Sequence, residues 1–330
     1  MIKKIETSRL EELRKAFDGK KIAVIGDMML DCYITGTTKR ISPEAPVPVV
    51  EIENEFSRFG GAANVALNIV KLGGIALPFG VIGEDTYADM FSDLLYASNI
   101  SSDGLIRTKS RPTTAKTRII AHHQHVVRID KESTEPIDAE TESRLLKAFE
   151  QIVADVDGVI LQDYNKGVLN ESFITNAISL ARKHKKLITV DPKFNNFFAY
   201  KDVTVFKPNR KEASDVLKMK IKNPEDVEKA CSLLMQKLNA EYILLTLGEE
   251  GVAVFNKEGV VKRMPTKARK VADVSGAGDT VISTLTMALS AGATIEEACY
   301  LANYAGGLVC EEVGIIPIEK DKLFTAVEED

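Results

Sequence analysis

The chain has 330 residues, of which 45% are hydrophobic and 28% are charged, and its formal net charge at pH 7 is −5. This length and apolar content suffice to bury a sizeable core, as one large α/β domain or two smaller ones. The acidic balance argues against a general nucleic-acid binder, which needs clustered basic charge, and no apolar run is long enough for a membrane span.

The N-terminal segment lacks the continuous apolar core of a signal peptide, so we expect a cytoplasmic protein. The four cysteines have no CxxC spacing, and free thiols are the expectation for that compartment. The segment instead predicts an amphipathic helix, with Ser8 and Glu11 at the spacing of a capping box.

The next segments predict a strand, an edge strand and a helix. The run KIAVIGDMMLD is typical of a buried strand that opens onto a loop at Asp27. The stretch PVPVVEIENEFSRF alternates but contains Pro46 and Pro48, which favours an exposed or edge strand. The stretch GGAANVALNIVKLGG predicts a helix bounded by glycines at both ends.

Further along, TTAKTRIIAHHQHVVRID is typical of a β-hairpin, and DGVILQDY, KLITVDPK, VTVFKPN and YILLTLGEEGVAVF predict short strands. Helices are expected over 138–154, 170–185, 210–218, 224–238, 276–291 and 294–313. This alternation predicts an α/β fold with a mostly parallel sheet covered on both faces. The hairpins near 32–58 and 113–130 do not fit that sheet, and we expect them to form a small inserted β-sheet lid.

The stretch VADVSGAGDT precedes one of these helices and has the composition of an anion site. Gly276 and Gly278 allow backbone conformations closed to other residues, and a helix N-terminus behind them favours a phosphoryl group. Asp279 adds a carboxylate that could take a proton from an attacking hydroxyl. An ordinary helix cap is the alternative. The dinucleotide fingerprint fails because Val281 replaces its third glycine, and the Walker A pattern is absent from the chain.

Residues 273–279 resemble the D-T-x-G-A-G-D signature of PfkB-type (ribokinase-like) sugar kinases, with Val274 and Ser275 in the variable positions. Gly60, Gly61 and Asn64, in GGAAN, match the glycine-rich N-terminal signature of the same family. Order and spacing agree over essentially the whole chain. The resemblance implies a ribokinase-like three-layer α/β/α domain with a small lid, and a kinase that uses ATP and Mg²⁺. A non-catalytic sugar-binding module is disfavoured, because it has no need of a base.

Within the family, RISPEAPVPVVEIENEFSRFGGAANVALNI and LQDYNKGVL resemble the D-glycero-β-D-manno-heptose-7-phosphate kinases. This branch implies phosphorylation of the C1 hydroxyl to give the 1,7-bisphosphate, in ADP-heptose synthesis for lipopolysaccharide or other surface polysaccharides. A kinase of another sugar phosphate or of a nucleoside is the alternative. Such kinases are often fused to an adenylyltransferase domain with an H-x-G-H motif. That motif does not occur here, so we expect a single kinase domain over 1–330.

The resemblance also implies roles for individual residues. Asp279 is expected to be the catalytic base, with an anion hole for the γ-phosphoryl group formed by the amides of Gly276, Ala277 and Gly278. Asp27, Gly60, Gly61 and Asn64 are expected to contact the sugar. The distal sugar phosphate needs cations, and the candidates are Arg40, Lys116, Arg118, Arg128 and Lys166. Asp163 would bind the sugar or orient Lys166. Solvated lid charges and a strand-end turn are the alternatives.

Asn209 and Glu212 resemble the N-x-x-E motif, which positions magnesium and ATP phosphates through water. A capping-box pair is the alternative. Thr246 and Gly248 are expected to contact ATP, and Asn303 to line the adenine pocket or to serve helix packing.

The lid carries two further patterns. His122, His123 and His125 lack acidic or cysteine partners at metal-ligand spacing, and we expect them at the lid surface. Apolar residues such as Val47, Val49 and Ile52 would be exposed on an isolated lid, which predicts a homodimer through the lid.

Overall fold

The computed structural model describes residues 4–122, 124–259, 261–267, 272–312 and 314–329. Among these residues, nine strands form one large sheet. In spatial order they are β13 (Val261–Met264), β12 (Val252–Asn256), β11 (Tyr242–Thr246), β10 (Val205–Phe206), β9 (Leu187–Asp191), β8 (Gly158–Gln162), β1 (Lys21–Gly26), β4 (Ile75–Gly83) and β5 (Leu105–Thr108). From β11 to β5 the neighbours pair in parallel, and only β12 and β13 pair antiparallel.

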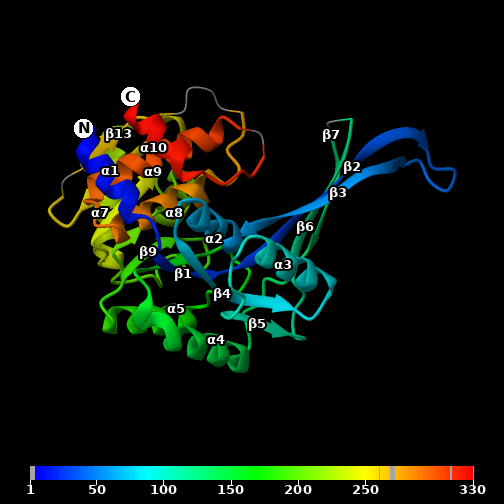
Figure 1. Ribbon diagram of the computed structural model, residues 1–330, viewed down its shortest axis with the longest axis horizontal. Coiled ribbons are helices and arrows are strands. Elements are labelled where there is room, and N and C mark those ends of the chain that lie inside the picture. Colours follow the sequence, from blue (N-terminus) through cyan, green and yellow to red (C-terminus); the bar gives the residue numbers. More distant parts are fainter. Residues whose placement is uncertain (1–3, 123, 260, 268–271, 313, 330) are drawn as a thin grey trace.

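Helices cover both faces of this sheet, which confirms the predicted fold class (Figure 1). One layer contains α1 (Thr7–Ala16), α2 (Ala62–Lys71), α8 (Ala277–Ser290), α9 (Ile295–Cys310) and α10 (Lys320–Glu328). The other contains α4 (Ala139–Ile152), α5 (Glu171–Lys183), α6 (Arg210–Leu217) and α7 (Pro224–Leu238). Short 3₁₀ turns lie at Val153–Asp155 and Gly248–Glu250.

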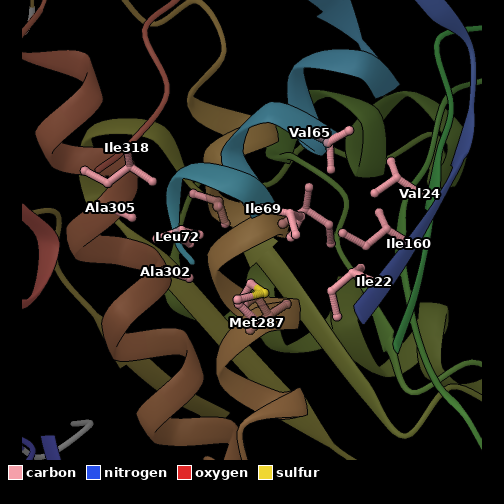
Figure 2. Packing of buried hydrophobic residues seen from close by; sticks show 14 of the residues in the cluster. Ile22, Val24, Val65, Ile69, Leu72, Ile160, Met287, Ala302, Ala305 and Ile318 are labelled. Atoms are coloured by element: carbon pink, nitrogen blue, oxygen red, sulfur yellow. The ribbon is translucent and has the colours of Figure 1, made fainter. Parts of the chain in front are cut away.

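The core consists of two apolar layers, one on each side of the sheet. Strand β1 supplies both, because Ile22 and Val24 face one layer while the alternating Ala23 and Ile25 face the other. Figure 2 shows the first layer, where β1 and β8 meet α2, α8 and α9. Strands buried on both faces explain the continuous apolar runs that the sequence displays.

A second sheet, the lid, projects from the body (Figure 1). It consists of β3 (Pro48–Gly61), β2 (Met28–Ile41), β6 (Thr114–Ala121) and β7 (Gln124–Lys131), in that order. Parallel pairing of β2 with β6 joins the two predicted hairpins into one sheet. Helix α3 (Thr86–Ala97) packs beside the base of β3. Strand β3 lies at the sheet edge, in agreement with Pro48 at its start.

Two local predictions are wrong. Asp27 alone separates β1 from β2, so the first strand does not open onto a loop. Helix α1 begins at Thr7 after Glu6, without a side-chain cap, because Ser8 already lies inside the first turn; the capping box with Glu11 therefore does not form.

The other predicted helices were found with ends within about three residues, whereas α3 and α10 were not predicted. Among the described residues, no helix is both long and apolar enough to cross a bilayer.

Candidate active site

The carboxyl ends of the central parallel strands bring polar residues to one edge of the sheet. Asp27 follows β1, Gln162 ends β8, Asp191 ends β9 and Lys207 follows β10. In open α/β sheets, ligands bind in the crevice outside these strand ends. A pocket of about 800 Å³ lies at this edge. Its lining includes Tyr164, Asp191, Lys193, Lys207, Asn209, Glu212, Thr246, Gly248, Gly276, Ala277, Gly278, Asp279 and Asn303.

The start of α8 forms one wall of the pocket. Gly276 is the residue before the helix and has φ of 80°, a conformation that favours glycine. Asp273 shapes the preceding turn, since its carboxylate accepts from the amides of Ser275 at 2.9 Å and Gly314 at 3.1 Å. The amide of Ala277 donates to the Val274 carbonyl at 3.3 Å, so the turn already uses it. The helix N-terminus still favours an anion at this wall.

Asp279 lies in the first turn of α8 and is only 5% exposed. Its Oδ1 accepts from the Tyr164 hydroxyl at 2.6 Å and from Gln162 Nε2 at 3.1 Å, while Oδ2 accepts from Asn64 Nδ2 at 2.8 Å. Burial raises the pKa of Asp279 to about 6, against the opposing effect of the Asn64 and Tyr164 hydrogen bonds. A carboxylate with this pKa can act as a proton acceptor near neutral pH.

A buried ion pair lies beside Asp279. Lys207 Nζ is 2.9 Å from Asp191 Oδ2, and Gln162 Nε2 also donates to that oxygen at 3.2 Å. Burial raises the pKa of Asp191, and the nearby Lys207 opposes the shift. A Cβ on Gly278 would lie 3.6 Å from Asp191 and 3.7 Å from Lys207. The helix start therefore approaches this pair closely.

Asn209 and Glu212 form the capping box that the sequence left as an alternative. The Asn209 side chain accepts from the Glu212 amide at 2.8 Å, and Glu212 Oε2 accepts from the Asn209 amide at 2.9 Å. Glu212 Oε1 lies 2.7 Å from Lys193 Nζ. Both residues also line the pocket, so capping and ligand contact are compatible.

The geometry around Glu212 suits magnesium held through water. Both carboxylate oxygens already have protein partners, which disfavours direct ligation. Mg²⁺ keeps several waters and uses few protein carboxylates when phosphates share its coordination. Among the described residues, no group of three or more histidine, cysteine or acidic side chains could hold a metal ion. Glu212 and Asp191 are among the carboxylates that line the pocket and could orient the water shell of a magnesium–nucleotide complex.

The remaining candidates for nucleotide contact line the same pocket. Thr246 ends β11 and forms an isolated bridge with Asn209. Gly248 has φ of 64° and open space where a Cβ would be. Asn303 is 5% exposed on α9 and donates to the Pro265 carbonyl at 2.7 Å, which orients its side chain at the pocket wall.

Asp27 has a different environment from the one expected for a sugar ligand. It is 1% exposed, and its carboxylate accepts backbone N–H groups of Tyr164 at 2.8 Å, Lys166 at 3.0 Å and Val168 at 3.3 Å. Burial raises its pKa, against these three hydrogen bonds. The contacts of Asp27 thus anchor the loop 164–168, and its contact with a sugar stays a prediction.

Glycines at the base of the lid permit close packing. A Cβ on Gly60 would lie 2.5 Å from Asp31 Oδ2, and one on Gly61 would lie 2.4 Å from the Asp27 carbonyl oxygen. Gly61 also has φ of 56°. Gly61 is therefore required by the backbone, whereas a side chain at Gly60 would displace the Asp31 carboxylate, whether or not a sugar lies against these glycines.

Four of the five expected phosphate-binding cations are engaged in ion pairs. Lys116 and Lys166 both contact Glu132, at 2.9 Å and 2.7 Å, which brings the lid and the 164–168 loop together. Arg118 pairs with Asp31, and Arg128 pairs with Asp130 at 2.9 Å.

Arg40 lies far from these cations, near the outer end of β2. At about 3.3 Å per residue, the strand carries it roughly 40 Å from Asp27, so it cannot share a sugar with Asp279 of the same chain. That expectation is corrected for a single protomer.

One of the two roles expected for Asp163 was to orient Lys166, and the hydrogen bonds of Asp163 do not include Lys166. Its carboxylate accepts from the Tyr200 hydroxyl and the Asn165 amide, both at 2.7 Å. Burial, followed by the charge of Asp27, raises its pKa to about 6.

Of the lid histidines, His122 contacts the Thr38 backbone, His125 is exposed on β7, and His123 lies outside the described residues.

Five residues that line the pocket or contact Asp279 were not predicted from the sequence: Gln162, Tyr164, Asp191, Lys193 and Lys207. A signal was present, because each of them ends or follows a predicted apolar strand, within LQDYN, TVDPK or VFKPN. Parallel strands deliver such residues to a common edge. The neighbours that they would meet there depend on the strand order, which the sequence alone did not supply.

Comparisons with known proteins found related sequences and similar folds. The profile of the pfkB family carbohydrate kinases matches residues 19–321. The "Bifunctional protein HldE" of Helicobacter pylori (strain P12) is 42% identical over 295 residues, which cover 89% of this chain and 64% of that protein. The protein of the same name from Desulfatibacillum aliphaticivorans is 39% identical over 307 residues, covering 93% and 63%. The chain thus spans less than two thirds of the length of these relatives.

Solved structures show the same fold. Ribokinase of Arabidopsis thaliana, complexed with ribose and ATP, aligns with a TM-score of 0.74 at 18% identity, over 94% of this chain and 99% of that chain. The tetrameric inhibited form of phosphofructokinase-2 from Escherichia coli aligns with a TM-score of 0.74 at 19% identity, over the same shares. With the family profile spanning the body, the lid and the helix that carries Asp279, the chain belongs to the pfkB family of carbohydrate kinases, for which ATP is the expected phosphoryl donor.

Proposed function

We propose that the protein transfers the γ-phosphoryl group of ATP to the C1 hydroxyl of D-glycero-β-D-manno-heptose 7-phosphate. The product is the 1,7-bisphosphate, an intermediate of ADP-heptose synthesis. The observation that carries the phosphoryl transfer is Asp279, a buried carboxylate with a pKa of about 6 at a helix N-terminus that opens into the pocket. The likeness to HldE proteins and to the heptose phosphate kinase branch supports the choice of sugar.

The reaction requires one proton transfer and one displacement. The sugar hydroxyl donates its hydrogen to Asp279, and its oxygen attacks the γ-phosphorus as the carboxylate takes the proton. The bond from the γ-phosphorus to the β–γ bridging oxygen breaks, and ADP leaves with that oxygen. The N-terminus of α8, at Gly276 and Gly278, stabilises the negative charge of the transferring group, with Lys207 nearby. The Ala277 amide was expected to contribute as well, but it already serves the preceding turn.

We propose Mg²⁺ as the metal that accompanies ATP. When bound, the ion would neutralise charge on the β- and γ-phosphates. Glu212 would hold its water shell while Lys193 keeps that carboxylate in place at 2.7 Å. Thr246, Gly248 and Asn303 would contact the nucleotide along the same wall of the pocket.

A phosphorylated acceptor fits the cations at the junction of the lid and the body. Lys116 and Lys166 share Glu132, and a phosphate would compete with that carboxylate for both ammonium groups. Because Lys116 comes from β6 and Lys166 from the 164–168 loop, a bound phosphate would join the lid to the body. Arg118 and Arg128 are further candidates on the lid, although each already has an acidic partner.

We also propose a homodimer formed through the lid. Ile52, Val127 and Ile129 are 56%, 46% and 53% exposed, and Val47 near the outer end is 51% exposed. The register places Ile34, Ile119 and Val127 side by side on one face of the lid. A second copy covering this face would remove the exposed apolar area from water.

An acceptor panel tests the sugar assignment. ADP formation is measured with heptose 7-phosphate, fructose 6-phosphate and a nucleoside, and phosphorus NMR of the product identifies the phosphorylated hydroxyl. We expect turnover with the heptose phosphate and a new phosphate at C1. Turnover with only one of the other acceptors would assign the enzyme to that substrate class instead.

A lysine variant tests the phosphate contact. K166M should raise KM for the phosphorylated sugar by about tenfold, as expected for the loss of one charged contact to a phosphate. K183M, on the exposed surface of α5, is the matched control and should leave KM unchanged. An unchanged KM in K166M would remove Lys166 from the phosphate site.

A further inference from the structure

The hydroxyl of Tyr164 makes the shortest of the three side-chain hydrogen bonds to Asp279, yet the phosphoryl transfer described above does not use it. The residue follows β8 and lies in the loop that Asp27 anchors, with its backbone amide 2.8 Å from Asp27 Oδ2. Its ring lies 5.8 Å from Lys193 Nζ, which in turn contacts Glu212. Tyr164 therefore touches Asp279 on one side and the Lys193–Glu212 pair on the other.

The two oxygens of Asp279 are not equivalent. An ionised carboxylate offers about four lone-pair sites, two on each oxygen. Tyr164 and Gln162 occupy both sites of Oδ1, at 2.6 Å and 3.1 Å, and Asn64 occupies one site of Oδ2, at 2.8 Å. One site remains, on Oδ2, and it is where an incoming hydroxyl can donate.

We infer that Tyr164 is a positioning residue that holds Oδ1 of Asp279, so that Oδ2 accepts the proton of the attacking sugar hydroxyl. The inference rests on the proposed role of Asp279 as the base. Gln162 contributes to the same arrangement but bridges to Asp191, whereas the single hydroxyl hydrogen of Tyr164 is donated to Asp279.

Tyr164 remains a donor at all pH values relevant to the enzyme. Burial and the charges of Asp279 and Asp191 hold its pKa well above the usual range, so it does not ionise. The groups that face Asp279 come from four neighbouring segments: Asn64 on α2, Gln162 and Tyr164 at the end of β8, Asp191 on β9 and Lys207 after β10. Of these, the Tyr164 hydroxyl can be removed by deleting one oxygen atom.

The test is the pH dependence of kcat/KM in Y164F. The phenyl ring keeps its packing under Lys193, while the carboxylate loses a donor that stabilises its charged form. The pKa of Asp279 should therefore rise, and the acid limb should move to higher pH by about one unit, the size expected for one lost hydrogen bond to a charged group. We also expect kcat to fall by about tenfold, with KM for ATP unchanged. The ionisation of the sugar phosphate is common to all variants and cancels in the comparison.

The matched control is Y200F. Tyr200 is also a buried tyrosine that donates to a carboxylate with a pKa of about 6, but its partner is Asp163. The acid limb should stay in place in Y200F. A limb that moves in Y200F and not in Y164F would assign the titration to Asp163 and overturn the inference, as would equal shifts in both variants.

Two further measurements keep the outcomes distinct. Incorporation of 3-fluorotyrosine at position 164 retains the contact but makes the phenol more acidic, so the limb should move to lower pH; this tests the inference if Y164F does not fold. D279N separates the role of the base from the role of Tyr164. If D279N is inactive and the limb of Y164F is unmoved, Tyr164 has no positioning role; if D279N is active, the base itself is misassigned.

Discussion

The substitution D27N separates anchoring of the 164–168 loop from sugar binding. The sequence suggests that Asp27 holds sugar hydroxyls, whereas in the structure its carboxylate accepts three backbone N–H groups, from Tyr164, Lys166 and Val168. Asparagine has nearly the same shape, but one of its two terminal groups is a donor. It therefore cannot accept all three N–H groups.

The size of the effect follows from these contacts. The amide oxygen of the introduced asparagine would best take the place of Oδ2, which serves Tyr164 at 2.8 Å and Lys166 at 3.0 Å. The NH₂ group would then face the Val168 amide, now 3.3 Å from Oδ1, and leave that buried donor without a partner. An unsatisfied buried donor costs about 1–3 kcal/mol, so we expect the free energy of unfolding to fall by that amount.

Urea unfolding of the sugar-free enzyme measures this directly, with kinetics as the second readout. Because the loop carries Tyr164, we expect kcat to fall together with stability. The reasoning would be refuted if D27N unfolded within about 0.5 kcal/mol of the wild type, below the cost of one unsatisfied donor, while KM for the sugar rose steeply. That result would return Asp27 to the role of a sugar ligand.

Three further predictions concern the base, the helix start and the lid. Asp279 must be ionised to accept a proton, and its pKa is raised to about 6, so kcat/KM should rise as the pH increases through 6. In an ADP-release assay, D279N should lower kcat by about 10²–10⁴-fold. Full activity of D279N would exclude the role of Asp279 as the base. G276A should lower the free energy of unfolding in urea by about 1–2 kcal/mol and lower kcat, because φ at Gly276 is 80°. G292A is the control: φ at Gly292 is 85° and a Cβ there would meet open space, so this variant should lose stability without losing activity. Light scattering should find a dimer at micromolar concentration and a monomer for I129D, whereas a monomeric wild type would refute the lid interface.

Some of the site was predictable because it is local in sequence. A glycine in the left-handed region before a helix, followed by an acid in the first turn, is a short-range pattern, and the segment around Asp279 has it. The capping box of Asn209 and Glu212 is equally local, and only its place in the pocket needed the fold.

Contacts between distant segments could not be predicted in this way. Asn64, Gln162 and Tyr164 reach Asp279 across 215, 117 and 115 residues of sequence. The strand order decides these contacts, because β8 lies between β1 and β9 and directs its end toward α8. The anchoring role of Asp27 was missed for the same reason, since its partners lie 137–141 residues away.

The sequence by itself determined the alternation of strands and helices, the lid hairpins and the kinase signatures, since periodicity and glycine placement act within a few residues. Only the tertiary structure decided which of the acids lines the pocket at the helix N-terminus. Asp27, Asp163, Asp191 and Asp279 are all buried or partly buried acids near the same strand ends. Loop amides engage the first, Asn165 and Tyr200 the second and Lys207 the third. Asp279 lines the pocket at the start of α8 with the neutral partners Asn64, Gln162 and Tyr164, because long-range packing fixes the place and the partners of each carboxylate.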